Sequence, residues 1–499
     1  MNTDNNRAVY VNQYSGRTYP TCSPYHPDRI YPEFSSQPSV IDPTNLVFGY
    51  LRDLLHRAGL DRAHFDTRDW NPLGELIQPG NTVLLKPNMV LHKNELKTDT
   101  IDCVITHGSL IRAVLDYVFI ALNGQGQVIV ADAPIQSCDF QEVIKANGLI
   151  DIQNHFRQTG RNFEIIDLRN EWVRVNPKGE ITQVITLPGD PAGYAQIDLG
   201  RDSLFAELDP KHPKLRVTSY DPSVMKEHHN QQVHEYLIAK SVLAADVVIN
   251  LPKPKTHRKA GITGAMKNLV GINGNKDWLP HHRNGSRNAQ GDEYDHRSGS
   301  KALLTLVQET IDRCDIHGHV RTGTLLKTLA TGLKLIKRKL IRDRDPYQQG
   351  SWWGNDTIWR TVGDLNRIFL YADTQGALQE TVQRKVISIL DMIISGEKEG
   401  PLKPTAKPCG VLMLGYNSLA LDTALAAIMG FDYTKLPSII HSYQIGKYPI
   451  LTGQPTDIEI HANVPAWCAG IDRIRRVDSL QFTPSAGWAG HIEAEEISP

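Results

Sequence analysis

The sequence predicts an α/β protein with two Rossmann-like lobes whose sheets are mostly parallel, joined by a β-rich insertion and a helical insertion. Short apolar, β-branched runs alternate with amphipathic helical segments over most of the 499 residues. Several of these runs stop at a proline or glycine and are followed by polar side chains. The composition, 40% hydrophobic and 22% charged, is ordinary for a globular protein, and the length suits two or three domains.

We expect seven segments along the chain. They are an irregular N-terminal extension (1–45), a first α/β lobe (46–160), a β-rich insertion (161–235), a central α/β segment with a lysine-rich loop (236–315), a basic amphipathic helical insertion (316–350), a second α/β lobe (351–435) and a C-terminal tail (436–499).

Charge and hydropathy narrow the classes of function. The formal net charge is -1, which argues against a dedicated nucleic-acid binder and restricts anion recognition to local sites. No apolar run approaches the ~18–20 residues that a membrane-spanning helix needs. The first residues lack the apolar core of a secretory signal, so we expect a cytoplasmic location.

The first lobe begins with an amphipathic helix over 45–60, followed by a short buried strand over 82–85. A helix over 110–120 and a second strand over 127–131 come next. Polar residues stand where these strands end and where the helix begins. They are Lys86, Asn88, His107 and Asp132.

Two residues of this lobe have competing interpretations. The positive end of the helix dipole would keep His107 neutral, as suits an acid–base residue, although a histidine at a helix start is most often a surface residue. Cys138 follows the second strand in a polar loop and is a candidate nucleophile if a neighbouring base lowers its pKa.

The β-rich insertion reads as irregular hairpins among charged, proline- and glycine-rich pieces, and we expect it to cover the site. A helix over 233–243 then leads back toward the centre of the molecule.

The stretch Val247–Ile272 organises the chain. It starts as a buried strand, and Pro252 and Pro254 then force a loop. Five basic side chains follow, before a short helix opened by Gly264. They are Lys253, Lys255, His257, Arg258 and Lys259.

This arrangement suits an anion site, because ligands of α/β sheets bind beyond the carboxyl ends of strands and near helix N-termini. Thr263, Lys267 and Asn268 belong to the same candidate site. A solvated basic loop is the alternative.

A glycine- and asparagine-rich loop follows, with two histidines and two carboxylates about ten residues apart. These four are His281, His282, Asp292 and Glu293. They are candidate ligands of a divalent metal, and a mobile lid is the alternative that we favour.

Further along, we expect an amphipathic helix over 301–315. Residues 321–344 combine a leucine stripe with eight cations, which suits either packing on the protein or peripheral contact with an anionic membrane surface. Strands over 385–394 and 411–414 and a helix over 419–429 complete the second lobe. Asn417, just before that helix, is a candidate substrate-binding residue.

Several of these segments together resemble the family called domain of unknown function 362. The matching pieces are LLKPN (84–88), THGSLIRAV (106–114), VIVADAP (128–134), LPKPKTH (251–257), TGAMKNLVG (263–271), GPL (400–402) and GYNSLALDTALAAIMGFD (415–432). Many members of that family carry a cysteine-rich iron–sulfur module. The six cysteines of this chain are dispersed and form no such run, so a cluster is not carried over.

A narrower resemblance links residues 257–271 to nickel-pincer lactate racemases. In those enzymes a histidine is the proton-transfer base and a lysine ten positions later anchors the cofactor. His257 and Lys267 have that spacing. The resemblance implies a shared α/β ancestry more than a shared reaction.

We therefore expect an enzyme that acts on a small anionic substrate, a carboxylate or a phosphate, in a cleft between the lobes. His257, Lys267, His107 and Asp132 are the candidate catalytic residues. Substrate binding is assigned to Lys86, Asn88, Lys253, Lys255, Thr263, Asn268 and Asn417. The reaction, isomerase-, epimerase- or transferase-like, and the cofactor are left open.

Three alternatives stay open. One is a non-catalytic binder of an anionic ligand, held at a membrane by 321–344. Another is a redox protein without an iron–sulfur cluster of its own. The third is a relative of the nickel-pincer racemases.

Overall fold

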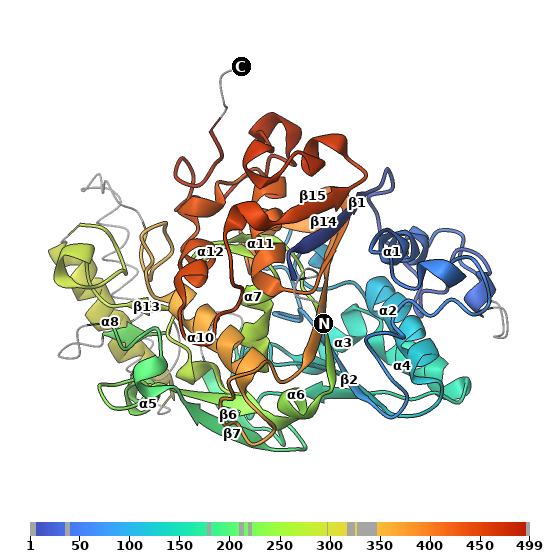
Figure 1. Cartoon of the computed structure of the whole chain (residues 1–499). Helices are drawn as coiled ribbons and strands as arrows, with labels where there is room; N and C mark the ends of the chain where they lie inside the picture. The colour runs from blue at the N-terminus through green and yellow to red at the C-terminus, as the bar shows by residue number, and fades with distance from the viewer. Residues whose placement is uncertain are drawn as a thin grey trace.

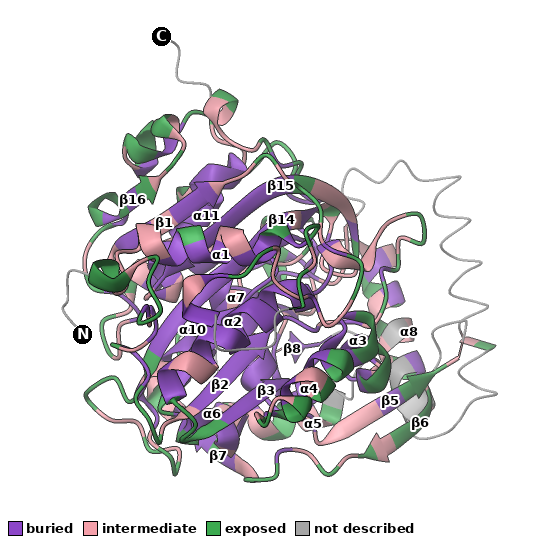
Figure 2. Cartoon of the chain, turned by 90° about the vertical axis from the view of Figure 1, so that its right-hand side faces the viewer, coloured by how far each residue is buried: buried purple, intermediate pink, exposed green. Residues whose placement is uncertain are grey.

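A computed structural model of the chain describes residues 6–34, 40–176, 181–208, 214–217, 222–296, 298–316, 325–326 and 347–495. One large sheet crosses the molecule, with helices on both of its faces (Figure 1). The central strands of this sheet are mostly buried, and the exposed residues lie on the outer helices, on the loops and on peripheral strands such as Ile181–Thr186 (Figure 2). This confirms the predicted α/β class.

The large sheet is mostly parallel. Its path runs β16 (Glu459–Ala462), β1 (Ala8–Gln13), β15 (Lys403–Gly415), β14 (Lys385–Glu399), β10 (Val247–Leu251), β2 (Thr82–Pro87), β3 (Gln127–Asp132) and β4 (Glu164–Asp167). Strand β15 is antiparallel to both neighbours, and the other adjacent strands of this path are parallel.

The strands expected in two lobes lie in this single sheet. Strand β10 joins them, because it pairs with β2 of the first predicted lobe and with β14 of the second. The N-terminal extension, expected to be irregular, also contributes a strand. Val9 and Val11 of β1 are fully buried between β15 and β16, because their alternation places both side chains on one apolar face.

Helices cover both faces of the sheet. The described helices of the chain are α1 (Leu46–Arg57), α2 (Gly108–Leu122), α3 (Phe140–Ala146), α4 (Leu149–Gln158), α5 (Pro222–His228), α6 (Lys240–Ala244), α7 (Ala265–Asn268), α8 (Gly299–Ile316), α10 (Ile358–Tyr371), α11 (Ser418–Met429) and α12 (Pro437–Ile440), of which α5 and α8 lie at the periphery (Figure 1). Helices α1 to α4 pack on the face that carries Val83 and Leu85, whereas α6 and α10 pack on the face that carries Leu84. Helix α11 packs on β1, β14 and β15.

The β-rich insertion forms small two-stranded sheets, two of which also use strands of the following central segment. The strands are β5 (Glu171–Val175), β6 (Ile181–Thr186), β7 (Tyr194–Asp198), β8 (Leu215–Arg216), β9 (Glu235–Ala239) and β13 (His282–Arg283). Strand β5 pairs with β6, β7 with β9, and β8 with β13. The helix predicted over 233–243 is wrong in its first half, because β9 pairs with β7 there and only α6 is helical.

The helix predicted over 301–315 is confirmed as α8. The basic segment 321–344 lies outside the described residues, apart from the two helical residues 325 and 326. Among the residues that the structure does describe, no helix is both long enough and apolar enough to span a bilayer.

Candidate functional site

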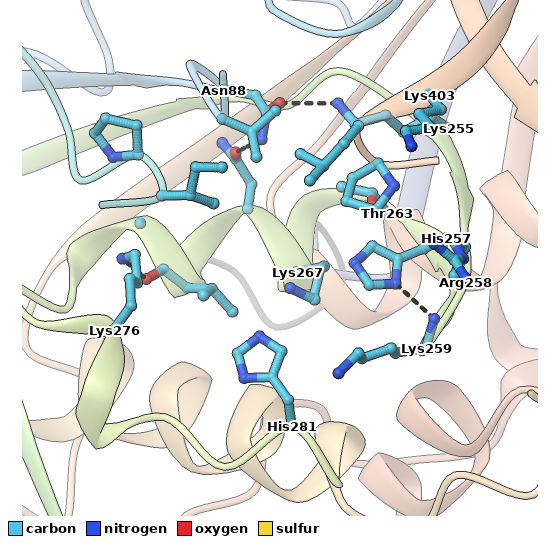
Figure 3. A pocket seen from close by; sticks show the side chains of 18 of the residues that line it. Asn88, Lys255, His257, Arg258, Lys259, Thr263, Lys267, Lys276, His281 and Lys403 are labelled. Atoms are coloured by element: carbon cyan, nitrogen blue, oxygen red, sulfur yellow. Dashed lines mark hydrogen bonds between the residues drawn. The ribbon is translucent and has the colours of Figure 1, made fainter. Parts of the chain in front are cut away.

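A cavity of about 310 Å³ opens where the parallel strands β2, β3 and β10 end (Figure 3). This is the position at which α/β sheets bind ligands. Its polar lining comes from segments far apart in the chain. The lining includes Asn88, Asp132, Lys255, His257, Lys259, Thr263, Lys267, Asn268, Lys276 and His281. Most of the predicted site residues therefore surround one hollow.

The lysine-rich loop folds back over the sheet as a short hairpin, β11 (Lys255–His257) and β12 (Gly261–Thr263). Strand β11 also pairs with β14 at Gly396, which fixes Lys255 above the sheet. Gly261 has a positive φ of 78°, and a Cβ there would lie 2.4 Å from Leu436. Glycine is therefore required at this turn.

Helix α7, which carries Lys267, is fixed by a carboxylate from another helix. Asp422 of α11 accepts hydrogen bonds from the backbone N–H groups of Ala265 (2.5 Å) and Met266 (3.0 Å). These are donors of the first turn, which have no partner inside the helix. Burial raises the pKa of Asp422 to about 7. The helix start is thus occupied by the protein's own carboxylate.

A buried ion pair closes the floor of the site. Lys86 Nζ lies 2.7 Å from Asp132 Oδ1, and Asp132 Oδ2 accepts the backbone N–H of Met89 at 2.8 Å. Burial lowers the pKa of Lys86, and the carboxylate opposes that shift. Gly271 packs directly on the pair, because a Cβ there would lie 2.0 Å from Asp132 Oδ1. Lys86 supports the cavity without lining it.

A chain of amide hydrogen bonds holds the next layer. Lys255 Nζ donates to Asn88 Oδ1 at 2.9 Å and to the carbonyl of Val104 at 2.6 Å. Asn88 Nδ2 donates to Asn268 Oδ1 at 2.9 Å, and Asn268 Nδ2 donates to Asn250 Oδ1 at 2.8 Å. These bonds orient Asn88, Lys255 and Asn268 as one unit.

Four lysines of the cavity have pKa values near neutrality. Burial lowers the pKa of Lys255, Lys259 and Lys276 to about 7, and that of Lys267 to about 8. Lys276 Nζ donates to the carbonyls of Val270 and Asn273, both at 2.9 Å. Within the described part of the chain, Lys255, Lys267 and Lys276 have no carboxylate partner, and Lys267 has no hydrogen bond to its amine.

Two histidines of the cavity are held in opposite tautomers. His257 Nδ1 accepts the backbone N–H groups of Lys259 and Ala260, both at 3.1 Å, so its proton is on Nε2. His281 Nδ1 lies 2.7 Å from the carbonyl of Leu279, so its proton is on Nδ1 and Nε2 keeps a lone pair. Burial, reinforced by Lys267, lowers both pKa values well below the usual range. Both rings are neutral at pH 7.

Figure 3 shows the Lys267 side chain beside the rings of His257 and His281. The electrostatic effect of Lys267 on both imidazoles agrees with that proximity. A hydrogen-bond donor, a hydrogen-bond acceptor and an amine are therefore grouped at one end of the cavity.

The acidic residues at the rim have partners of their own. Glu399 lies 3.2 Å from Arg258, and Glu95 lies 3.5 Å from Lys403. These pairs are exposed and contribute little energy. Neither carboxylate is paired with Lys255, Lys267 or Lys276.

Residues 83–197 and 202–427 match the family model described as domain of unknown function (DUF362), which is more than half of the chain. The chain belongs to the DUF362 family. No curated protein matches it.

Among solved structures, the chain is similar to a crystal structure of a protein from Thermotoga maritima. The identity is 11% and the TM-score is 0.28. The match covers 74% of this chain and 57% of the other, so the DUF362 chain spans a little over half the length of that protein.

Two predicted residues belong to a neighbouring buried cluster and do not line the cavity. Lys253 Nζ lies 2.7 Å from Asp391 and 2.7 Å from the Tyr19 hydroxyl, and Tyr19 stacks on His107. His107 caps α2 by accepting the N–H of Ser109, and burial lowers its pKa to about 4. Both residues stabilise the fold, because β14 brings Asp391 between them.

Asn417 is also structural. Its side chain caps α11 by accepting the N–H groups of Leu419 (2.9 Å) and Ala420 (3.2 Å), and it donates to the carbonyl of Ile450. It does not line the cavity.

The four metal candidates separate in the structure. Asp292 accepts hydrogen bonds from Thr357 and from two backbone N–H groups, and Glu293 accepts them from Thr305 and Gly285. His282 lies beside the Lys259 amine at 3.5 Å. Only His281 lines the cavity. The part of the chain that is described contains no group of three or more His, Cys, Asp or Glu side chains arranged to bind a metal.

The prediction that Cys138 could be a nucleophile is wrong. Its side chain is fully buried, and burial raises the pKa of the thiol to about 12. The thiolate that a nucleophile requires is therefore not formed near pH 7.

Three residues that line the cavity are not among the predicted catalytic or substrate-binding residues. Lys276 follows Gly274 and Asn275 in a loop that was assigned to a lid, and Lys259 was counted only as a charge of the loop. His281 was assigned to a metal. The glycine-rich sequence before Lys276 was the available signal, since glycine permits close approach of a backbone to a ligand.

Proposed function

We propose that this DUF362 protein is an enzyme that binds a small anionic substrate and transfers protons by lysine and histidine acid–base chemistry. The observation that carries the proposal is a set of three cavity lysines without a carboxylate partner among the described residues. They are Lys255, Lys267 and Lys276. A buried ammonium group without a counterion is costly, and a bound carboxylate or phosphate would compensate it.

Binding is assigned to the amines of Lys255 and Lys276 and to two neutral groups. Asn88 lines the cavity and is already oriented by Lys255. Thr263 Oγ1 is buried and has no hydrogen-bond partner in the described structure. A buried hydroxyl in that state costs free energy unless a ligand binds it. Thr263 therefore supports a polar ligand at this end of the cavity.

Catalysis is assigned to the two histidines and Lys267. His281 Nε2, with its lone pair, would accept a proton from the substrate, and His257 Nε2–H would donate to a substrate oxygen that gains charge. Asp132 keeps Lys86 in place and so holds the floor of the site. Isomerisation and epimerisation next to a carbonyl or carboxylate fit this pair, and group transfer is compatible.

Solvent exchange tests this proposal without knowledge of the product. The protein is incubated in deuterium oxide with a panel of small carboxylates and phosphate esters, and proton NMR follows the loss of carbon-bound hydrogens. We expect exchange with at least one compound, a loss of exchange of at least about 100-fold in His281→Gln and His257→Gln, and no change in Lys145→Arg. Lys145 is exposed on α3, outside the cavity.

Binding without exchange would instead favour a non-catalytic anion-binding protein. Equal exchange in the wild type and in His281→Gln would remove His281 from the mechanism. A thermal melt of each variant shows whether the substitution disturbs the fold.

A second candidate is a relative of the nickel-pincer lactate racemases. It is favoured by the fact that His257 and Lys267, ten positions apart, both line the cavity. In that case His257 would be the proton-transfer base and Lys267 would hold the cofactor. Mass spectrometry of the purified protein is the test, with a covalent adduct on Lys267 and bound nickel as the expected result.

We also propose a cytoplasmic protein that has no nucleic-acid partner and contacts a membrane peripherally through residues 321–344. The support is the near-zero net charge of the chain and the eight cations of that segment.

A further inference from the structure

The amine of Lys267 differs from the other amines of the site. Lys255 and Lys276 donate to fixed oxygen atoms, and Lys86 is paired with Asp132. The Lys267 amine has no partner among the described residues, and its side chain lines the wall of the cavity. A lysine held by hydrogen bonds serves as a fixed charge, whereas a free one can react.

The surroundings of this amine suit covalent chemistry. The rings of His257 and His281 lie on either side of Lys267 in Figure 3, the first with a proton on Nε2 and the second with a lone pair on Nε2. The hydroxyl of Thr263, without a partner in the described structure, lines the same cavity. One group can therefore donate a proton, another can accept one, and a third can bind an oxygen.

We propose that Lys267 forms an imine with the carbonyl group of the substrate, which makes the substrate an anionic aldehyde or ketone such as a 2-oxo acid. This inference rests on the proposed function, since the anionic group would be bound by Lys255 and Lys276. It narrows the substrate class from any small anion to one that also carries a reactive carbonyl.

The step balances without a further reactant. The lone pair of Lys267 Nζ attacks the carbonyl carbon, the C–N bond forms, and the carbonyl oxygen takes up a proton. His281 Nε2 accepts each proton that the nitrogen loses and passes it to the former carbonyl oxygen, first to form the hydroxyl and then as that hydroxyl leaves. His257 Nε2–H donates a hydrogen bond to this oxygen and keeps its own proton. One water is released and one C=N bond replaces one C=O bond. Hydrolysis reverses the sequence, and no oxidant or reductant is involved.

The state of the amine is compatible with this step. Burial and the neighbouring Lys86 lower the pKa of Lys267 to about 8, so about half of the amine is neutral at pH 8. An imine withdraws electrons from the adjacent carbon and would make its proton easier for His281 to remove. The inference thus connects Lys267 to the acid–base pair.

Reductive trapping tests the proposal. The full chain is incubated with pyruvate and sodium cyanoborohydride at pH 8, and peptide mass spectrometry locates the added carboxyethyl groups. We expect Lys267 to be modified at least about tenfold faster than Lys145, which is exposed on α3. Excess sulfate, a competing anion without a carbonyl group, should slow modification of Lys267 and leave that of Lys145 unchanged.

Two variants complete the design. Lys267→Arg should lose the fast modification, whereas Lys145→Arg should keep it. If Lys267→Arg has a lower melting temperature than the wild type, Lys267→Met is used in its place. Modification spread evenly over the exposed lysines, or fast modification elsewhere in Lys267→Arg, would overturn the imine.

Sulfate binding, measured by calorimetry, separates this result from the proposed function. If the wild type binds sulfate but Lys267 is not trapped, the imine fails and the anion site stands. If sulfate does not bind at all, the proposed function fails as well.

Discussion

Binding of an anion to the cavity should be coupled to proton uptake. The perturbation is the addition of sulfate, which does not itself titrate between pH 6 and 9. Lys255 and Lys276 have pKa values of about 7 and Lys267 has one of about 8 in the free protein. A bound anion favours the ammonium form, so it raises all three pKa values and the lysines take up protons.

The magnitude follows from these values. At pH 7 a lysine with a pKa of about 7 is about half protonated, and Lys267 is about nine-tenths protonated. If sulfate restores full charge to all three, the uptake is about one proton at pH 7 and about two at pH 8. By linkage, the affinity then falls by up to about fiftyfold from pH 7 to pH 8.

Isothermal titration calorimetry in buffers with different ionisation enthalpies measures the uptake directly. Lys276→Met should take up about half a proton less at pH 7, because one titrating amine is gone. Lys145→Met, on the exposed side of α3, should match the wild type. Sulfate binding with no proton uptake and with equal affinity at pH 7 and pH 8 would refute the reasoning.

Three further predictions concern the fold, a thiol and the basic segment. Gly271→Ala should lower the free energy of unfolding in urea by about 3–5 kcal/mol, because its Cβ would lie 2.0 Å from Asp132 Oδ1 and 2.6 Å from Lys86 Nζ and so would separate a buried ion pair. Gly446→Ala, with nothing within 4 Å of its Cβ, is the control, and equal urea midpoints for both variants would contradict the role of Gly271. Iodoacetamide at pH 8 should alkylate Cys138 at least about 100-fold more slowly than the exposed Cys22 and Cys468, since its thiol is buried with a pKa of about 12, and similar rates would show that this region opens readily. Deletion of 321–344 should abolish sedimentation with phosphatidylserine liposomes, and unchanged sedimentation would discard the membrane contact.

Local patterns were sufficient for the order of elements along most of the chain. The strands β2, β3, β10, β14 and β15 and the helices α1, α2, α8 and α11 all fall where the apolar periodicity predicts them. Strand β1 was missed because its six residues stand among tyrosine, proline and asparagine, without a second strand nearby in sequence. Its partners, β15 and β16, are about 400 residues away.

The lysine-rich stretch was predictable for a similar reason. Its prolines, glycines and polar residues stand close together in sequence, so Lys255, His257, Thr263, Lys267 and Asn268 reach one cavity through a single hairpin and a short helix. The relative positions of these five residues therefore depend mainly on the backbone conformation of one short segment.

The predicted site residues whose positions depend on other segments were harder to place. Lys253 and Lys255 are two residues apart, yet only Lys255 lines the cavity. A regular strand would place residues i and i+2 on the same side, but Lys253 lies in the proline-containing loop between β10 and β11, where Asp391 of β14 pairs with it. His107 is drawn to the same cluster by Tyr19, which no pattern in the sequence connects to it.

The sequence by itself determined the α/β class, the family and the lysine-rich segment, because hydrophobic periodicity and turn residues act over a few positions. The tertiary structure alone decided which charges remain without a counterion. It paired Lys86 with Asp132 and Lys253 with Asp391, and it fixed the tautomers of His257 and His281 through backbone groups. Charge compensation and burial depend on contacts between distant segments, so the chemistry of the cavity emerges only when the sheet is assembled.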